Sequence, residues 1–169
     1  TLADTSWYNQ TDDTFTLTTA AQLAGLAKVL RNSASFTGKT IRLGGDVDFS
    51  NTDGTTAIRY FSRIGADTLH PFTGTFDGCG YAITHFDGAC VGSFGGLFGY
   101  TQNAVIKNLS ITGSYTATAG TVGILAGYAE STTVQNVSAT VAVAGTTSVG
   151  GLIGSARGTT QLLDCAVFG

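Results

Sequence analysis

The chain has 169 residues, of which 43% are hydrophobic and 11% are charged, and its formal net charge is −3 at pH 7. The apolar content excludes a disordered chain, and its 8 scattered Lys and Arg residues are too few for a groove that follows nucleic-acid phosphates. No stretch is apolar over the length that a membrane-spanning helix needs. The sequence therefore predicts neither a nucleic-acid partner nor membrane insertion.

The same composition bears on domain organisation and location. The length suits a single domain over residues 1–169. Thr and Ser stand where Lys and Glu usually cover a surface, a pattern typical of secreted proteins, so we predict an extracellular protein that is secreted or attached to a cell wall. Because the sequence starts at Thr1, we also expect a processed or excised piece of a longer protein.

The N-terminal part predicts one short strand at residues 15–17 and one helix at residues 18–31. Thr18 or Thr19 can cap this helix, and Leu23, Leu26 and Leu30 fall on one of its faces. An amphipathic helix ahead of a run of strands can cover the open end of a strand stack, whose edge would otherwise expose unpaired backbone groups.

Short strands are predicted next, in residues 38–49 and 72–87. Ile41 and Leu43 alternate with polar residues, and Val47 and Phe49 do so again after a pair of glycines turns the chain. Residues 72–87 give two more short strands around a glycine corner.

The C-terminal half repeats one unit three times. A Gly-rich block at 94–100 recurs at 122–128 and 149–155, and an apolar block at 106–110 recurs at 134–138 and 162–166. Asn108, Asn136 and Asp164 follow one another at a step of 28 residues, and matching residues 83–87 to the same block adds His85 at a step of 23. The repeats then cover about 72–168. Such a period indicates stacked units that are too small to bury their own apolar faces.

Together these features predict an all-β fold, a right-handed parallel β-helix with an N-terminal capping α-helix. We choose the right hand because parallel crossovers strongly prefer it. Similar residues then form ladders along the stack, since neighbouring strands lie about 4.8 Å apart. A β-propeller fits less well because its blades need about 40 residues and four strands each.

At this point the sequence resembles a known family. Gly-Gly-Leu-Phe-Gly at 95–99, Gly-Ile-Leu-Ala-Gly at 123–127 and Gly-Gly-Leu-Ile-Gly at 150–154 are similar to the GLUG motif, and segments at 17–26, 36–43, 46–50 and 72–78 look like the start of GLUG-repeat proteins of bacterial surfaces. The resemblance covers about residues 7–168. It implies a β-helix in a large secreted or wall-attached protein, often an adhesin-like one, and it supplies no catalytic residues. The third copy departs from the pattern, with Asp164-Cys165 in place of Asn-Leu or Asn-Val.

Two sets of residues are candidates for binding. The column His85, Asn108, Asn136 and Asp164 is either a structural ladder of corner side chains, the interpretation we favour, or a row of ligand contacts. Tyr100 and Tyr128 occupy matching places in the repeat, and they could stack on sugars or pack beneath a loop.

The three cysteines raise the separate questions of a disulfide and of a buried thiol. Cys79 and Cys90 can form a disulfide in an exported protein, although an extended segment between them would hold them too far apart. Cys165 matches Leu109 and Val137 in the repeat, which predicts a buried, small apolar side chain.

Metal binding and catalysis find little support in the sequence. Asp46, Asp48, Asn51 and Asp53 miss the EF-hand spacing, so we predict no metal and no cofactor. The chain has one glutamate, Glu130, and nothing ties a nucleophile to a base.

The leading functional hypothesis is a non-catalytic structural and adhesive module that presents a rigid β-helix to a glycan or to a host or matrix protein. The alternative is a fragment of a polysaccharide hydrolase or lyase, in which Asp77, Asp87 and His85 would act. A third hypothesis, ice binding by Thr rows at 116–118 and 138–140, ranks lowest because the Thr spacing is not maintained. We also expect further β-helix or further domains after residue 169.

Overall fold

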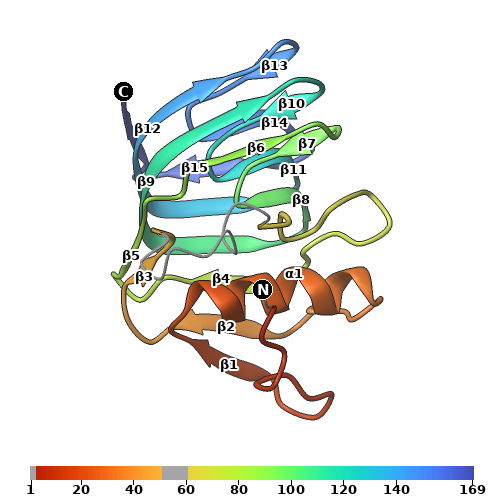
Figure 1. The fold of residues 1–169 in the computed structure, drawn as a ribbon. Helices are drawn as coiled ribbons and strands as arrows, with labels where there is room; N and C mark the ends of the chain where they lie inside the picture. Colours follow the sequence, from red (N-terminus) through yellow and green to blue (C-terminus); the bar gives the residue numbers. More distant parts are fainter. Residues whose placement is uncertain (1–2, 51–60) are drawn as a thin grey trace.

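The computed structural model describes residues 3–50 and 61–169. It is a parallel β-solenoid of about five turns with one short helix near the N-terminus (Figure 1). The elements are β1 (Thr14–Leu17), α1 (Ala20–Arg31), β2 (Thr40–Leu43), β3 (Val47–Asp48), β4 (Thr75–Asp77), β5 (Ala82–Thr84), β6 (Gly88–Cys90), β7 (Phe94–Gly95), β8 (Phe98–Gln102), β9 (Val105–Ala117), β10 (Thr121–Val122), β11 (Ala126–Glu130), β12 (Thr133–Ala144), β13 (Ser148–Val149), β14 (Ile153–Arg157), β15 (Gln161–Leu163) and β16 (Ala166–Phe168). The predicted β-helix is confirmed.

The strands of successive turns pair in parallel and build three walls. The largest sheet has ten strands and contains the path β1-β2-β4-β9-β12-β15, while β7, β10 and β13 form a second sheet and β8, β11 and β14 a third. The longest pairing joins β9 to β12, with Val105 opposite Thr133 and Ser110 opposite Ser138. These partners are 28 residues apart, so the sequence period is the length of one turn.

Alternation along the strands places one apolar column inside the solenoid. Phe76, Ile106 and Val134 follow one another in register and are fully buried. Large rings fill the first turns, where Phe98 packs against both Phe72 and Phe76. Burial of this surface contributes on the order of 25 cal/mol per Å², and it is the main force that holds the turns together.

The N-terminal helix closes the start of this core. Thr19 caps α1, and its side chain accepts a hydrogen bond from the Gln22 backbone while the Gln22 side chain reaches back, a capping box. Leu23, Leu26 and Leu30 of α1 are buried in the core cluster, as the sequence predicted. In Figure 1 the helix lies beside the first strands, at the N-terminal end of the stack.

The last turn ends the apolar column. Leu162 continues the column above Val134 but is 47% exposed, whereas Val134 is fully buried. Val167 continues a second inner column above Ala139 and is 46% exposed. These side chains form the C-terminal end face of the core.

Candidate functional site

A ladder of amide side chains runs along one corner of the solenoid. Asn136 donates from Nδ2 to Asn108 Oδ1 at 3.1 Å, and Asn108 donates to Asp77 Oδ1 at 3.1 Å. Asp164 continues this column, because Leu163 pairs with Gln135 and Ala166 with Ser138. Each of the two Asn side chains donates a hydrogen bond to a side chain of the preceding turn, so these residues connect successive turns of the solenoid.

His85 does not belong to this ladder. Ile83 pairs with Ile111 rather than with Ile106, so His85 falls beyond the corner that holds Asn108. The predicted alignment is wrong here because the corner between β4 and β5 has two residues more than the corner between Ile106 and Ile111. Asp77 takes the place expected for His85 at the base of the ladder.

His85 instead pairs with an acid of the preceding turn. Its Nδ1 lies 2.8 Å from Asp48 Oδ1, and both side chains are at least half exposed. The Ser50 backbone N–H and hydroxyl also donate to Asp48, at 2.8 Å each. These hydrogen bonds, those from Ser50 first and that of His85 next, lower the pKa of Asp48 to about 2.

Tyr100 and Tyr128 are in register and belong to an aromatic cluster. Their ring centroids are 5.1 Å apart with nearly parallel planes, and the Phe94 ring lies 5.6 Å from each. Tyr100 is 7% exposed. The Arg157 guanidinium lies over the Tyr128 ring, 5.9 Å from its centroid. Tyr128 thus has Tyr100 stacked on it and a cation over its ring, and little of either ring remains for a sugar to stack on.

The Glu130 carboxylate is hydrogen-bonded to the aromatic cluster. The Tyr100 hydroxyl donates to Glu130 Oε2, and the Gln102 amide donates to the same oxygen at 3.4 Å. Burial, and then the hydrogen bond and charge of Glu130, raise the pKa of Tyr100 to about 12. This phenol therefore stays protonated at neutral pH.

A groove lies near Gln102, where three successive turns meet. Its volume is about 330 Å³. The side chains that line it are Thr37, Thr73, Thr75, Gln102, Asn103 and Val105, with Gly38 and Gly74 between them. None of these residues carries a charge. The groove could not be predicted from the sequence, because its residues come from turns of unequal length and share no motif.

The cysteines are free thiols in the structure. Cys79 lies at the corner after β4, where its Sγ is 3.4 Å from Arg42 Nε, and Cys90 is buried near the Phe94 carbonyl oxygen. The disulfide predicted as a possibility between them is thus absent from the structure, in which the β5 strand lies between the two cysteines along the chain. Cys165 is partly buried against the core, less than the full burial that was expected.

The described residues contain no group of three or more His, Cys, Asp or Glu side chains that could hold a metal ion. Asp46 accepts a hydrogen bond from the Ala82 backbone N–H, and Asp48 binds Ser50 and His85. Asn51 and Asp53, the other members of the calcium hypothesis, lie outside the described residues.

Asp77 and Asp87, the two acids of the enzyme hypothesis, bind different groups in the structure. Asp77 binds Asn108 and the Cys79 backbone, whereas Asp87 accepts from the Ser114 backbone N–H and hydroxyl. The two carboxylates share no hydrogen-bond partner among the described residues.

Comparison with known proteins gives no match. No family model, no curated protein and no solved structure is similar to this chain. The resemblance to GLUG-repeat proteins therefore stays a prediction. Within the described residues, the helix is too short and too polar to cross a membrane.

Proposed function

We propose that the chain is a non-catalytic extracellular module that presents a rigid β-helix for adhesion to a glycan or to a matrix protein. The observation that carries this proposal is the set of hydrogen bonds that the acidic side chains accept. Asp48, Asp77 and Glu130 each accept hydrogen bonds from side chains of neighbouring turns. Acids that fasten one turn to the next serve the stack, whereas a hydrolase needs two carboxyl groups that face a common substrate.

The surface of the stack supports the same proposal. Outward positions of neighbouring strands carry hydroxyl groups in register, with Ser110 opposite Ser138 and Thr112 opposite Thr140. Such rows form a neutral surface in which each hydroxyl oxygen holds a set place in the register and can either donate or accept. A fixed surface loses little conformational entropy on binding, which favours recognition of a polar partner.

The assignment to GLUG-repeat proteins of bacterial surfaces is part of this proposal. It rests on the motifs at 95–99, 123–127 and 150–154 and on their common role in the fold, since β8, β11 and β14 each begin within one of them. Location outside the cell stays a prediction of the same hypothesis.

A carbohydrate-active enzyme is the second candidate. The observation in its favour is the Tyr100–Glu130 pair, which lies next to Gln102 and hence close to the groove. The pair gives the site one carboxylate and one phenol. The ice-binding hypothesis needs Thr residues in one column, and the pairing does not favour it, because Thr116 pairs with Ala144 and lies in a different column from Thr140.

The test of the main proposal is a binding screen. The folded chain is applied to immobilised extracellular matrix proteins and to an array of glycans, with the urea-unfolded chain as a control. We expect saturable binding of the folded chain to at least one of these ligands. Binding to none of them would contradict the adhesive role and leave the β-helix as a spacer.

A further inference from the structure

The groove between three turns has the position and size of a ligand site. Thr37 and Gly38 come from the segment before β2, and Thr73 and Gly74 from the segment before β4. Gln102 is the last residue of β8, and Asn103 follows it in the corner that leads to β9. Its volume of about 330 Å³ is at the lower end of the range for small-molecule sites, about 300–1,000 Å³. It therefore suits a small molecule or a short section of a polymer.

Backbone hydrogen bonds between the turns hold the walls of the groove. The Thr75 N–H donates to the Lys39 carbonyl oxygen and the Val105 N–H to the Gly74 carbonyl oxygen, both at 3.0 Å. The Asn103 N–H donates to the Glu130 carbonyl oxygen at 3.0 Å. A site that is built before its ligand arrives binds with a smaller entropic cost.

The groups in the groove are hydroxyls and amides. The Thr37 and Thr73 hydroxyls lie 2.9 Å apart, and each oxygen retains further capacity to donate or accept. The Asn103 side chain is exposed and makes no hydrogen bond to another described residue, and Gln102 is half-buried. These groups match a ligand that offers several hydroxyls, each of which is both donor and acceptor.

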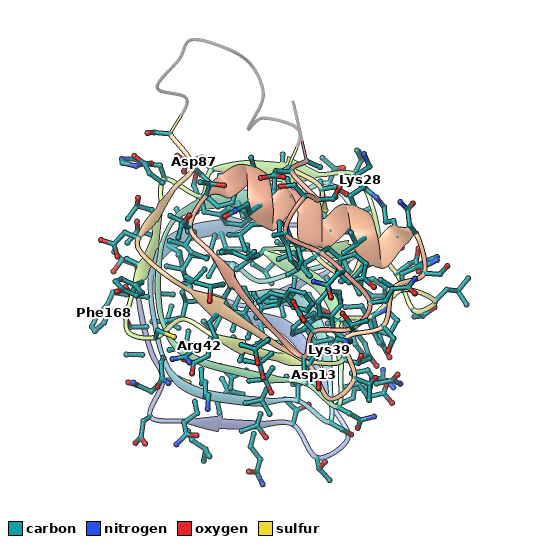
Figure 2. All side chains as sticks on the ribbon, turned by 90° about the horizontal axis from the view of Figure 1, so that it is seen from below. Asp13, Lys28, Lys39, Arg42, Asp87 and Phe168 are labelled. Atoms are coloured by element: carbon teal, nitrogen blue, oxygen red, sulfur yellow. The ribbon has the colours of Figure 1, made fainter. Side chains whose placement is uncertain are left out.

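The charges around the groove do not favour an anionic ligand. The nearest cation along the chain is Lys39, whose Nζ lies 3.3 Å from Asp13 Oδ1 and 2.6 Å from the Asp12 carbonyl oxygen. Figure 2 shows Lys39 and Asp13 together at one corner. Phosphate and carboxylate groups are held most strongly by cationic donors, and the groove lining supplies none. Val105 adds one apolar contact, which the C–H face of a sugar ring can cover.

We propose that this groove, rather than the tyrosine pair, binds a neutral saccharide. The inference rests on the proposed adhesive function, for which it names the ligand class and the site. Gln102 and Asn103 supply the amide contacts, Thr37 and Thr73 supply the hydroxyl contacts, and Val105 packs against the ring.

The experiment is an NMR titration of the isotope-labelled chain with methyl glycosides of glucose, galactose, mannose and N-acetylglucosamine. Glucuronic acid and inorganic phosphate are titrated in parallel. We expect saturable shifts of the Gln102 and Asn103 side-chain amide signals with at least one neutral glycoside, and none with phosphate. Shifts confined to residues around Tyr100 and Tyr128 would overturn the assignment of the site.

Two variants that add the same large side chain, one inside the groove and one outside it, test the site. Thr75 lines the groove, and Thr133 has the same outward position two turns further on but does not line it. We expect Thr75→Phe to raise the Kd for the glycoside at least about tenfold, while Thr133→Phe leaves the Kd unchanged. Gln102→Ala, which removes a contact without adding volume, should weaken binding as well if Thr75→Phe disturbs folding.

The outcomes separate the site from the general function. Equal Kd values for Thr75→Phe, Gln102→Ala and the unchanged chain would reject the groove but keep the adhesive role. No binding of any neutral glycoside, together with saturable binding to a matrix protein, would reject the saccharide class alone. Binding to neither would reject both proposals.

Discussion

At the scale of single residues, the corners of the solenoid depend on a backbone conformation that few residue types adopt. Asn108, Asn136 and Asp164 have φ values of 56°, 52° and 52°, which lie in the left-handed region. Asn and Asp accept this conformation more easily than other residues with a side chain. Asn108 and Asn136 thus provide both the turn and the ladder contact between turns.

The first prediction separates these two contributions. Asn136→Ala removes the hydrogen bond to Asn108 and places a Cβ without compensation at φ 52°, so we expect a loss of about 2 kcal/mol in the free energy of unfolding. Asn136→Gly removes only the hydrogen bond and should cost about 1 kcal/mol. Urea denaturation measures both, and equal stability of all three chains would contradict a structural role for the ladder.

The second prediction concerns acid. The pKa of Asp48 is lowered to about 2 from an ordinary value of 3.8, so its carboxylate form favours the folded state. That stabilisation is fully present above the ordinary value and is lost as the pH falls towards about 2. Between the ordinary pKa of 3.8 and about pH 2, the Asp48→Asn chain should therefore lose less free energy of unfolding than the unchanged chain. Parallel stability curves for the two chains, measured by urea denaturation at each pH, would contradict the account.

At the scale of elements, the repeated glycines allow two walls to approach each other closely. A Cβ at Gly127 would lie 2.5 Å from the Gly95 backbone nitrogen and 2.9 Å from Phe94 Cα. Both atoms belong to the backbone of the second sheet and cannot give way as a side-chain end would. The motif at 123–127 is thus a packing requirement of the fold, which is why it recurs once per turn.

The third prediction tests this packing. Gly127→Ala should lower the free energy of unfolding by about 3 kcal/mol or prevent folding, because it overpacks a contact between backbones. Gly45→Ala is the matched control, since a Cβ there would meet nothing within 4 Å. The control should be neutral or slightly stabilising. Thermal unfolding compares the two, and a Gly127→Ala chain as stable as the control would refute the argument.

The elements also show what the sequence could and could not predict. Alternation at Ile41 and Leu43, the capping residue Thr19 and the 28-residue step at Asn108 and Asn136 all carry local or periodic signals, and each predicted its element correctly. His85 was misplaced because a sequence match does not reveal extra residues in a corner. The groove stayed hidden, since Thr37, Thr73 and Gln102 meet only through the pairing of turns of unequal length.

At the scale of the whole molecule, the solenoid divides its residues between an apolar interior and fixed polar corners. The interior needs the same kind of residue at the same place in every turn. The corners and the outward columns are free of that requirement, so they can differ from turn to turn, as Thr75, Val105 and Thr133 do within one column. A neutral groove at one corner follows from this freedom.

The central claim is that the chain binds without catalysing, and a turnover assay on a bound glycan tests it most directly. A polysaccharide that the folded chain retains in the binding screen is incubated with the chain, and new reducing ends and unsaturated products are measured over time. Glu130→Gln serves as the control variant, because the Glu130 carboxylate accepts a hydrogen bond from Gln102, which lines the groove. We predict saturable binding and no product from either chain. Product that increases in proportion to the amount of the unchanged chain, and that Glu130→Gln abolishes, would contradict the account and establish an enzyme.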